Sequence, residues 1–382
     1  MKLELKIEKV AHGGVFVARP EGKVVLVHGA LPGETVLAEI TEDAKSFRRA
    51  DVVKVIEPSR HRLEHFWPVA LAGAGGAEFG HIQLDYQRVL KAEVLAEALE
   101  RMAGLKLPVA VLPADDTGLN YRTRIQLHGD KHGRLGVKRR RSDEVIAISS
   151  HPLALGELND SGVFAQRYSQ GDRVEIAVDQ LGNISKSVNG KSAAALTHFS
   201  AGSRKFNLSP GTFWQAHFNA PELLVGEVLA QLRALGEVGR VLDLYSGAGL
   251  FASNVAEEFD VPVTAVENSA AAIASGKKSA ADLKQLQFQQ SDVLRYLRSE
   301  QSAPDTLLLD PPRSGAATKV TLEIIRLQPK KIVYVACDPI ALARDLKLLS
   351  AAGYQIAALQ AFDIFPQTHH FETVVSLRLS NL

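Results

Sequence analysis

The feature that most constrains the fold is a regular alternation of strand-like and helix-like segments after Ser203. Short apolar runs, RVLDLYS, PVTAVEN, DTLLLDP, KIVYVAC and ETVVSLRL, are separated by stretches with helical spacing such as ASNVAEEF, AAAIASGKKSAADL and IALARDLKLLSAAG. Strands that alternate with helices form βαβ units, which favour a parallel, doubly wound sheet with ligands at the carboxyl ends of its strands. We therefore expect a Rossmann-like α/β domain over residues 203–382.

The first 58 residues follow a different pattern. Their alternating runs LELKIEKV, VFVARP, KVVLVHG, ETVLAEI and ADVVKVIE are punctuated by glycine and proline, and TEDAKSFRRA reads as a polar connection before the last run. This spacing predicts a small five-stranded β-barrel. Barrels of this size often bind oligonucleotides.

Residues 59–202 are expected to form a central mixed α+β subdomain, in which YQRVLKAEVLAEALERM (Tyr86–Met102) has the spacing of a linking helix. Between Arg122 and Arg141 the chain carries eight lysines or arginines and a single acidic residue, Asp130. A solvated hairpin is one interpretation, but the neighbouring barrel favours phosphate binding. The candidate RNA-binding residues are Arg122, Arg124, Lys138, Arg139, Arg140 and Arg141.

Composition limits the function classes. The net charge is only +1, so nucleic acid must be held by local basic clusters. The single cysteine, Cys337, excludes an internal disulfide and any metal site built from several thiolates. No apolar run approaches the roughly 20 residues of a membrane span, and no secretory signal opens the chain. We expect a cytoplasmic monomer that does not associate with membranes.

A glycine turn marks the expected cofactor site. The run VLDLYSGAGL places Gly247 and Gly249 between a strand and a helix, where the backbone can approach a ligand closely. Glu267 ends the next strand, where it can accept hydrogen bonds from ribose hydroxyls, and Asp292 follows in position to meet an adenine edge. Since Gly249 is not followed by the third glycine of a dinucleotide fingerprint, S-adenosylmethionine is favoured over NAD.

The candidate catalytic residues lie at the ends of two successive strands. Asp310-Pro311-Pro312-Arg313 follows TLLL, and its two prolines give a stiff segment that can hold a flat base. Cys337 ends the next strand, before Asp338-Pro339. Although free cysteines are most often buried hydrophobes, this position favours a nucleophile. Thiolate addition at carbon 6 of uracil creates the carbanion character that carbon 5 needs to accept a methyl group.

The same chemistry requires a base. After methyl transfer, the proton on carbon 5 must be removed before the thiol can leave. Glu372, at the end of the loop DIFPQTHHFE, is the best candidate, and Asp338 is the alternative.

These motifs resemble the 5-methyluridine RNA methyltransferases of ribosomal and transfer RNA, which carry an N-terminal TRAM-type barrel. The likeness covers essentially the whole chain and is most specific in LDPPR, VACDP and FDIFPQTHHFE. It implies that Cys337 is the nucleophile and Glu372 the base. The positions that match cofactor contacts of the family are Gln215, Tyr245, Glu267, Asp292 and Asp310.

The chain departs from the family at several positions. His217 replaces the usual asparagine two places after Gln215, and Leu250 replaces a frequently polar residue. Many members hold a four-cysteine iron–sulfur cluster, whose positions are Trp67, Ala74, Ala77 and His151 here. We expect no cluster, because no set of thiolates remains, and infer that packing replaces it.

Three other functions are alternatives to this interpretation, two of them catalytic and one not. A 5-methylcytosine RNA methyltransferase shares the addition chemistry but generally carries a cysteine where Arg313 stands. An amino-group methyltransferase usually has an aromatic residue there. A non-catalytic RNA-binding module is the third alternative, and the joint presence of Cys337 and Glu372 argues against it. The sequence leaves open which RNA and which uridine are modified.

Overall fold

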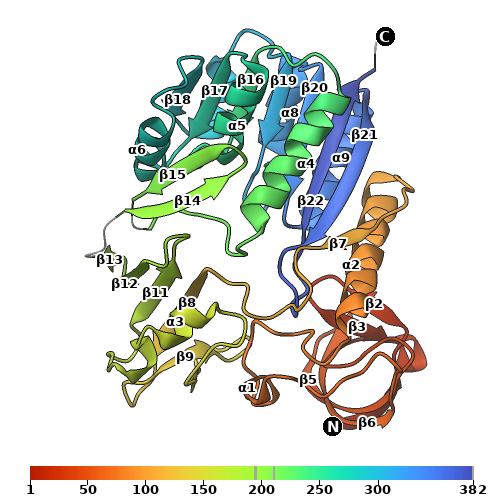
Figure 1. Ribbon diagram of the computed structural model, residues 1–382. Helices are drawn as coiled ribbons and strands as arrows, with labels where there is room; N and C mark the ends of the chain where they lie inside the picture. Colours follow the sequence, from red (N-terminus) through yellow and green to blue (C-terminus); the bar gives the residue numbers. More distant parts are fainter. Residues whose placement is uncertain (193–195, 210, 381–382) are drawn as a thin grey trace.

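The computed structural model describes residues 1–192, 196–209 and 211–380. Figure 1 shows a large sheet with helices on both faces, a barrel at the N-terminal end, and a smaller antiparallel sheet beside the barrel. Within the described ranges, no helix combines the length and apolar character that a membrane crossing requires.

The N-terminal barrel contains six strands rather than the expected five. They are ordered β1-β5-β6-β4-β3-β2: β1 (Lys2–Lys6), β2 (Lys9–Ala11), β3 (Val15–Ala18), β4 (Val24–His28), β5 (Thr35–Asp43) and β6 (Phe47–Glu57). The run LELKIEKV divides because the chain changes neighbours there: Ile7 N–H donates to Glu34 O, and Glu8 N–H donates to Val17 O. A 3₁₀ turn, η1 (Pro20–Gly22), precedes β4.

The polar segment TEDAKSFRRA is mostly strand, which corrects the expected connection. Only residues 44–46 link β5 and β6, and Glu42 pairs with Arg49 across the two strands. The Arg49 Nε atom lies 3.0 Å from Glu42 Oε2. Cross-strand charge pairs of this kind stabilise a solvated hairpin extension whose sequence lacks apolar alternation.

The largest sheet has eight strands in the order β18-β17-β16-β19-β20-β22-β21-β7. Their bounds are β7 (Val111–Pro113), β16 (Val241–Leu244), β17 (Val263–Glu267), β18 (Leu286–Gln290), β19 (Thr306–Leu309), β20 (Lys331–Ala336), β21 (Tyr354–Asp363) and β22 (Glu372–Leu379). The strands β16–β20 are parallel, as expected, but β22 runs antiparallel to both β20 and β21. The sheet is therefore mixed, because β21 and β22 are joined by a loop without a crossover helix.

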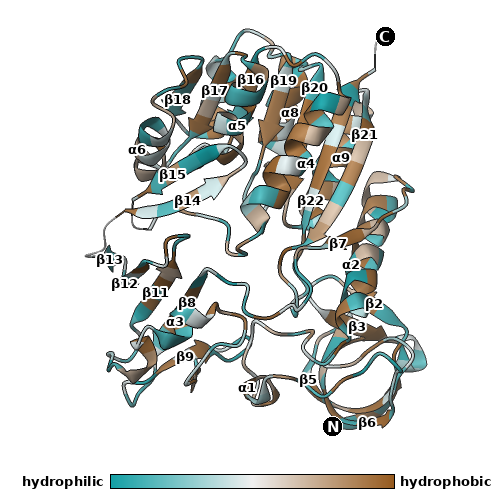
Figure 2. Cartoon of the chain, viewed as in Figure 1, coloured by the Kyte–Doolittle hydropathy of each residue, from teal (hydrophilic) through white to brown (hydrophobic). Residues whose placement is uncertain are grey.

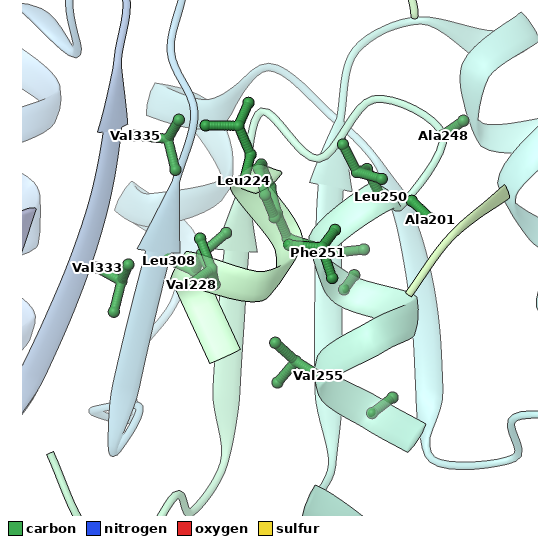
Figure 3. Packing of buried hydrophobic residues seen from close by; sticks show 14 of the residues in the cluster. Ala201, Leu224, Val228, Ala248, Leu250, Phe251, Val255, Leu308, Val333 and Val335 are labelled. Carbon is green, nitrogen blue, oxygen red and sulfur yellow. The ribbon is translucent and has the colours of Figure 1, made fainter. Parts of the chain in front are cut away.

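Helices cover both faces of this sheet. They are α4 (Ala220–Ala234), α5 (Leu250–Phe259), α6 (Ala270–Ser279), α7 (Val293–Ser299), α8 (Ala317–Leu327) and α9 (Pro339–Ala351). In Figure 3, Leu224 of α4 and Phe251 of α5 face Leu308 and Val333 of the strands. A second buried cluster joins the opposite face to α8 and α9. Figure 2 shows the hydrophobic strands enclosed between helices whose outer faces are more hydrophilic.

The linking helix attaches the barrel to this sheet. It runs from Leu84 to Ala98 as α2 and continues as a π-helical turn, η2 (Leu99–Ala103), so it begins two residues before the expected start. Leu90 packs into the core of the barrel, whereas Leu95 and Leu99 pack into the core of the large sheet. The helix thus belongs to both hydrophobic cores.

The remaining elements form the central region. Its sheet has the order β10-β9-β8-β11-β12-β13: β8 (Arg124–Gly129), β9 (Leu135–Lys138), β10 (Val145–Ala147), β11 (Arg173–Val178), β12 (Ile184–Val188) and β13 (Lys191–Ser192), with short helices α1 (Pro68–Leu71), α3 (Gly156–Asp160) and η3 (Val163–Ala165). A separate hairpin, β14 (Thr197–Ala201) and β15 (Arg204–Leu208), packs Phe199 and Phe206 into the core of α4 and α5. The expected boundary between the central subdomain and the α/β domain, after residue 202, falls in the turn that joins β14 to β15.

Candidate active site

The carboxyl ends of the parallel strands bring the expected site residues to one rim. Leu244 pairs with Val266 on one side and with Leu309 on the other, and Leu309 pairs with Tyr334. The residues that follow these strands therefore lie along one edge of the sheet: Tyr245, Asp310 and Cys337 come after β16, β19 and β20, and Glu267 ends β17.

The glycine turn has the backbone conformation that the sequence indicated. Gly247 and Gly249 have φ values of +55° and +83°, in the left-handed region that favours glycine. A Cβ atom at Gly249 would lie 2.8 Å from the Phe288 ring, whereas one at Gly247 would have no other atom within 4 Å. The Glu267 Oε2 atom accepts a hydrogen bond of 3.1 Å from the Gly247 N–H. The turn and the strand-end acid are thus joined directly.

Three other expected cofactor contacts lie around this rim. Asp292 is exposed and caps α7, since its Oδ1 accepts a 2.9 Å hydrogen bond from the Arg295 N–H. Burial, and then the charge of Asp292, raise the pKa of Tyr245 to about 12. Gln215 is buried on the segment that precedes α4. The Gln215 side chain donates or accepts no hydrogen bond in the described residues.

Acidic side chains are unusually concentrated beneath the rim. Asp243 and Glu372 are buried, and Asp310 is half-buried. Burial raises the pKa of Asp310 to about 7, and burial together with Asp310 raises the pKa of Asp243 and of Glu372 well above the usual range. Asp243 Oδ1 and Glu372 Oε2 have no hydrogen-bond partner in the described part of the chain. Such groups are positioned to accept a proton.

Cys337 and Glu372 are neighbours across two adjacent strands. Ala336, the last residue of β20, pairs with Thr373, so Cys337 and Glu372 occupy the next positions in the register. Burial, followed by the carboxyl groups of Glu372 and Asp310, raises the pKa of Cys337 to about 12, and the Arg313 guanidinium opposes this effect. The free protein therefore keeps the thiol protonated near neutral pH.

Asp338, the alternative base, has both carboxylate oxygens engaged. Its Oδ1 accepts hydrogen bonds from the N–H groups of Ile340 (3.0 Å) and Ala341 (2.8 Å) at the start of α9. Its Oδ2 lies 2.9 Å from Nε2 of His12 in the barrel. Burial alone would raise the pKa of Asp338, but these hydrogen bonds hold it below its usual value. Of the two candidates, Glu372 is the one with a carboxylate oxygen that has no hydrogen-bond partner among the described residues.

The loop that carries Glu372 is held by contacts that the sequence did not predict. Buried Lys91 of α2 donates from Nζ to Asp363 Oδ1 at 2.5 Å and to Phe365 O at 3.1 Å. Gln87, one turn earlier, donates to Gln367 Oε1 at 2.9 Å and accepts from the Gln367 N–H at 2.8 Å. The linking helix therefore fixes the loop that leads into β22.

His217 and Leu250, the two residues that depart from the family near the cofactor positions, are both buried. His217 is fully buried; its Nε2 lies 2.9 Å from Asp115 Oδ2, and its Nδ1 accepts from the Asn219 N–H at 3.0 Å. Because both ring nitrogens are engaged, His217 is not available for a cofactor contact. Leu250 is buried at the start of α5.

The positions of the family's iron–sulfur ligands lie in a packed region. The rings of Trp67 and His151 have centroids 5.1 Å apart, and Trp67 and Ala77 belong to the core of the central sheet. Ala74 forms an isolated bridge with Arg139. In the described ranges, no group of three or more histidine, cysteine, aspartate or glutamate side chains could hold a metal ion.

The expected RNA-binding residues fall into two groups. Arg122 lies over the rings of Tyr121 and Phe365 at 5.6 and 5.9 Å, and Arg124 lies 5.9 Å from the exposed ring of Phe213. The second group is on the surface, where β9 ends and a turn follows: Lys138, Arg139, Arg140 and Arg141.

Known proteins share these features. The profile of the family described as tRNA (Uracil-5-)-methyltransferase matches residues 224–380, and that of the TRAM domain matches residues 2–53. An uncharacterized RNA methyltransferase of Streptomyces avermitilis is 33% identical over 98% of this chain and 97% of that protein. The chain belongs to the tRNA (uracil-5-)-methyltransferase family. This membership confirms the resemblance that LDPPR, VACDP and the Glu372 loop indicated.

Two further members of this group of proteins are informative. The 23S rRNA (uracil(1939)-C(5))-methyltransferase RlmD of Shewanella halifaxensis is 29% identical over all of this chain and 96% of that protein. The tRNA (uracil-54, C5)-methyltransferase of Pyrococcus abyssi, solved in complex with S-adenosyl-L-homocysteine, superimposes with a TM-score of 0.76 at 22% identity, over 98% of this chain and all of that one. The second comparison confirms the α/β fold with its N-terminal barrel.

Proposed function

We propose that this protein transfers a methyl group from S-adenosylmethionine to carbon 5 of a uridine in ribosomal or transfer RNA, through a covalent bond to Cys337. The observation that carries the proposal is the adjacency of Cys337 and Glu372 at the ends of β20 and β22. A nucleophile and a base side by side are the two groups that addition and elimination at a pyrimidine require.

The rim suits a sulfonium nucleoside. Gly247 and Gly249 open the backbone at the start of α5, and Glu267 ends the next strand, where ribose hydroxyls would lie. Asp310 directly follows β19 at the same rim, and its carboxyl group is proposed to contact the positively charged donor. S-Adenosylmethionine supplies an electrophilic methyl group when bound. Gln215, Tyr245 and Asp292 are proposed to complete this site.

The residues of the chain then perform three tasks. The Cys337 thiol releases its proton to solvent, its sulfur attacks carbon 6 of uracil, and the electrons of the 5,6 double bond move toward oxygen 4. Carbon 5 of this adduct accepts the methyl group as the carbon–sulfonium bond breaks. Glu372 removes the proton from carbon 5, the double bond forms again, and the thiolate leaves. A carboxyl group with a raised pKa is a stronger base than an exposed glutamate.

The geometry also bears on the competing activities. Arg313 follows Asp310-Pro311-Pro312 at the position where 5-methylcytosine enzymes generally place a cysteine. Among the described residues, Cys337 is the only thiol at the rim. The arrangement therefore favours uridine over cytidine as the substrate.

The direct test is mass mapping of 5-methyluridine in ribosomal and transfer RNA from cells with the protein, cells without it, and cells with only the Cys337→Ala variant. The proposal predicts that one or more 5-methyluridines are present only with the wild-type protein. Identical maps would contradict it, and a change confined to 5-methylcytosine would establish the competing activity.

A further inference from the structure

A cavity of about 160 Å³ lies where three parts of the chain meet. The barrel contributes His28 and Arg49, the turn after β9 contributes Arg140 and Arg141, and the loop before Glu372 contributes His369. We call this space the junction cavity. None of the catalytic steps above uses it.

The arginines that line the junction cavity differ in whether a carboxylate is paired with them. Arg49 is ion-paired with Glu42 at 3.0 Å, and Arg140 with Asp51 at 2.8 Å. Arg141 is exposed, and in the described part of the chain its side chain has neither a hydrogen bond nor a carboxylate within 4 Å. Partial burial, and then the charges of Arg49 and Arg140, lower the pKa of Arg141, although Asp51 and Glu42 oppose this effect. Bringing an anion here would relieve this repulsion.

The other two basic side chains of the run, Lys138 and Arg139, are already paired with carboxylates. Lys138 Nζ lies 2.6 Å from Asp143 Oδ1, and Arg139 Nε lies 2.7 Å from Glu144 Oε2. Within the run from Lys138 to Arg141, Arg141 is therefore the cation best able to bind a phosphate.

The backbone holds Arg141 in an unfavourable conformation. Its φ is +56°, in the left-handed region, at the third position of a turn closed by a 3.1 Å hydrogen bond from the Ser142 N–H to Arg139 O. Glycine or asparagine is usual at such positions. The turn is also fixed by the Arg140 N–H, which donates to Gly73 O at 2.9 Å. Strain of this kind persists where the surrounding structure imposes it, often at ligand sites.

The barrel side of the junction cavity carries a polar group, on His28, that is not hydrogen-bonded. The Nε2 atom of His28 has no hydrogen-bond partner in the described residues, although buried polar atoms nearly always have one. Burial, and then Arg140, lower the pKa of His28 to about 3, so the ring is neutral and can donate one N–H group. Glu78 in the wall is half-buried; its Oε2 atom lies 3.8 Å from His369 Nδ1, and its Oε1 atom accepts from the Gly76 N–H at 2.8 Å.

The cavity adjoins the catalytic rim through two short connections. His369 lines the cavity and precedes Glu372 by three residues. Gly13 also lines it, and the adjacent His12 contacts Asp338, the residue after Cys337. A nucleotide extruded from RNA to reach Cys337 would carry its flanking phosphates past this region.

From the cavity, its unpaired arginine and its position, we propose that the junction cavity binds one backbone phosphodiester of the substrate RNA beside the target uridine, with Arg141 as the principal cation. The guanidinium fork matches two phosphate oxygens, and His28 can supply a further donor. This assignment rests on the proposed function and adds to it the position of the RNA strand at the active site.

The test compares the salt dependence of binding for the wild-type protein, Arg141→Gln and Arg101→Gln. The probe is a short single-stranded RNA with one central uridine, and binding is followed by fluorescence anisotropy. Arg101 is a matched control, since its exposed side chain on η2 also loses one charge. Arg141→Gln should reduce the magnitude of the log–log salt slope by roughly 0.7 for one lost contact with a single strand. Arg101→Gln should not change it. An unchanged slope in Arg141→Gln would overturn the proposal.

A methylphosphonate scan of the same RNA locates the contact. One linkage adjacent to the uridine should weaken binding to the wild-type protein when neutralised, and the same substitution should have no effect on Arg141→Gln. Equal sensitivity of both proteins at every linkage would overturn the proposal. Methyl transfer to RNA from cells that lack the protein is measured in parallel. If the wild-type protein forms no 5-methyluridine yet shows the Arg141-dependent linkage, the proposed function fails while the phosphate site stands.

Discussion

The Nε2 atom of His12 lies 2.9 Å from the Oδ2 atom of Asp338, so the N-terminal barrel contacts the residue that follows Cys337, the proposed nucleophile. These two residues are 326 positions apart in the chain. The contact engages the second carboxylate oxygen of Asp338, while the first caps α9. The barrel therefore helps to define the active-site rim besides its expected role in binding RNA.

Asp338→Asn should keep methyl transfer within about threefold of the wild-type rate, because asparagine also caps helices well and an exposed ion pair contributes at most about 1 kcal/mol. Turnover with labelled S-adenosylmethionine measures this, and Asp338→Ala, which also removes the cap, serves as the comparison. A loss as large as that of Glu372→Gln would make Asp338 the base.

Cys337→Ala should abolish methyl transfer and leave the affinity for S-adenosylmethionine within about twofold, because the thiol acts on the base and other residues hold the cofactor. Isothermal calorimetry and a turnover assay measure the two effects separately. Near-normal turnover in this variant would exclude a covalent mechanism through Cys337.

Glu372→Gln should stabilise the free protein near pH 8, because the folded state disfavours the charged carboxylate and glutamine carries no charge. The folded state raises the pKa of Glu372, so it binds more protons than the unfolded chain. The wild-type stability therefore falls as the pH rises from the ordinary carboxyl pKa toward the raised one. Urea unfolding at several pH values should show a variant advantage that grows with pH. The exposed Glu64→Gln control should show none.

Lys91→Met should destabilise the protein by about 3–5 kcal/mol, because it leaves Asp363 buried without a counter-charge. Adding Asp363→Asn should restore part of this loss. Arg88→Met on the same helix removes a pair with the exposed Asp85 and should cost less than about 1 kcal/mol. Equal effects of Lys91→Met and Arg88→Met in urea unfolding would show that the buried pair does not hold the loop.

The sequence predicts the features that depend on local patterns. The strand–helix alternation gave the parallel strands β16, β17, β19 and β20, and the glycine turn lies where VLDLYSGAG indicated. The sequence also proposes Cys337 as nucleophile and Glu372 as base, since each stands at a strand end in a recognisable motif, and these two roles stay predictions. The sequence alone does not show that the two residues are neighbours, because their adjacency depends on the pairing of β20 with β22.

Features that depend on distant pairings were not predictable. LELKIEKV reads as one strand, but at Ile7 the chain stops pairing with β5 and at Glu8 it meets β3. Lys91 reads as an exposed position of an amphipathic helix, yet it is buried because Asp363 lies opposite. Asp243 stands in an ordinary apolar strand, and its burial, followed by the neighbouring Asp310 carboxyl group, raises its pKa. Each of these depends on a residue that lies far away in the sequence.

Cys337 is proposed as the nucleophile and Glu372 as the base, and one measurement tests these two roles independently. Glu372→Gln is incubated with labelled S-adenosylmethionine and unpaired RNA from cells that lack the protein, and the products are resolved by denaturing electrophoresis. We expect a covalent protein–RNA complex that carries the transferred methyl group and is absent from the Glu372→Gln, Cys337→Ala double variant. Release of methylated RNA at the wild-type rate, with no trapped complex, would contradict the assignment of Glu372 as the base.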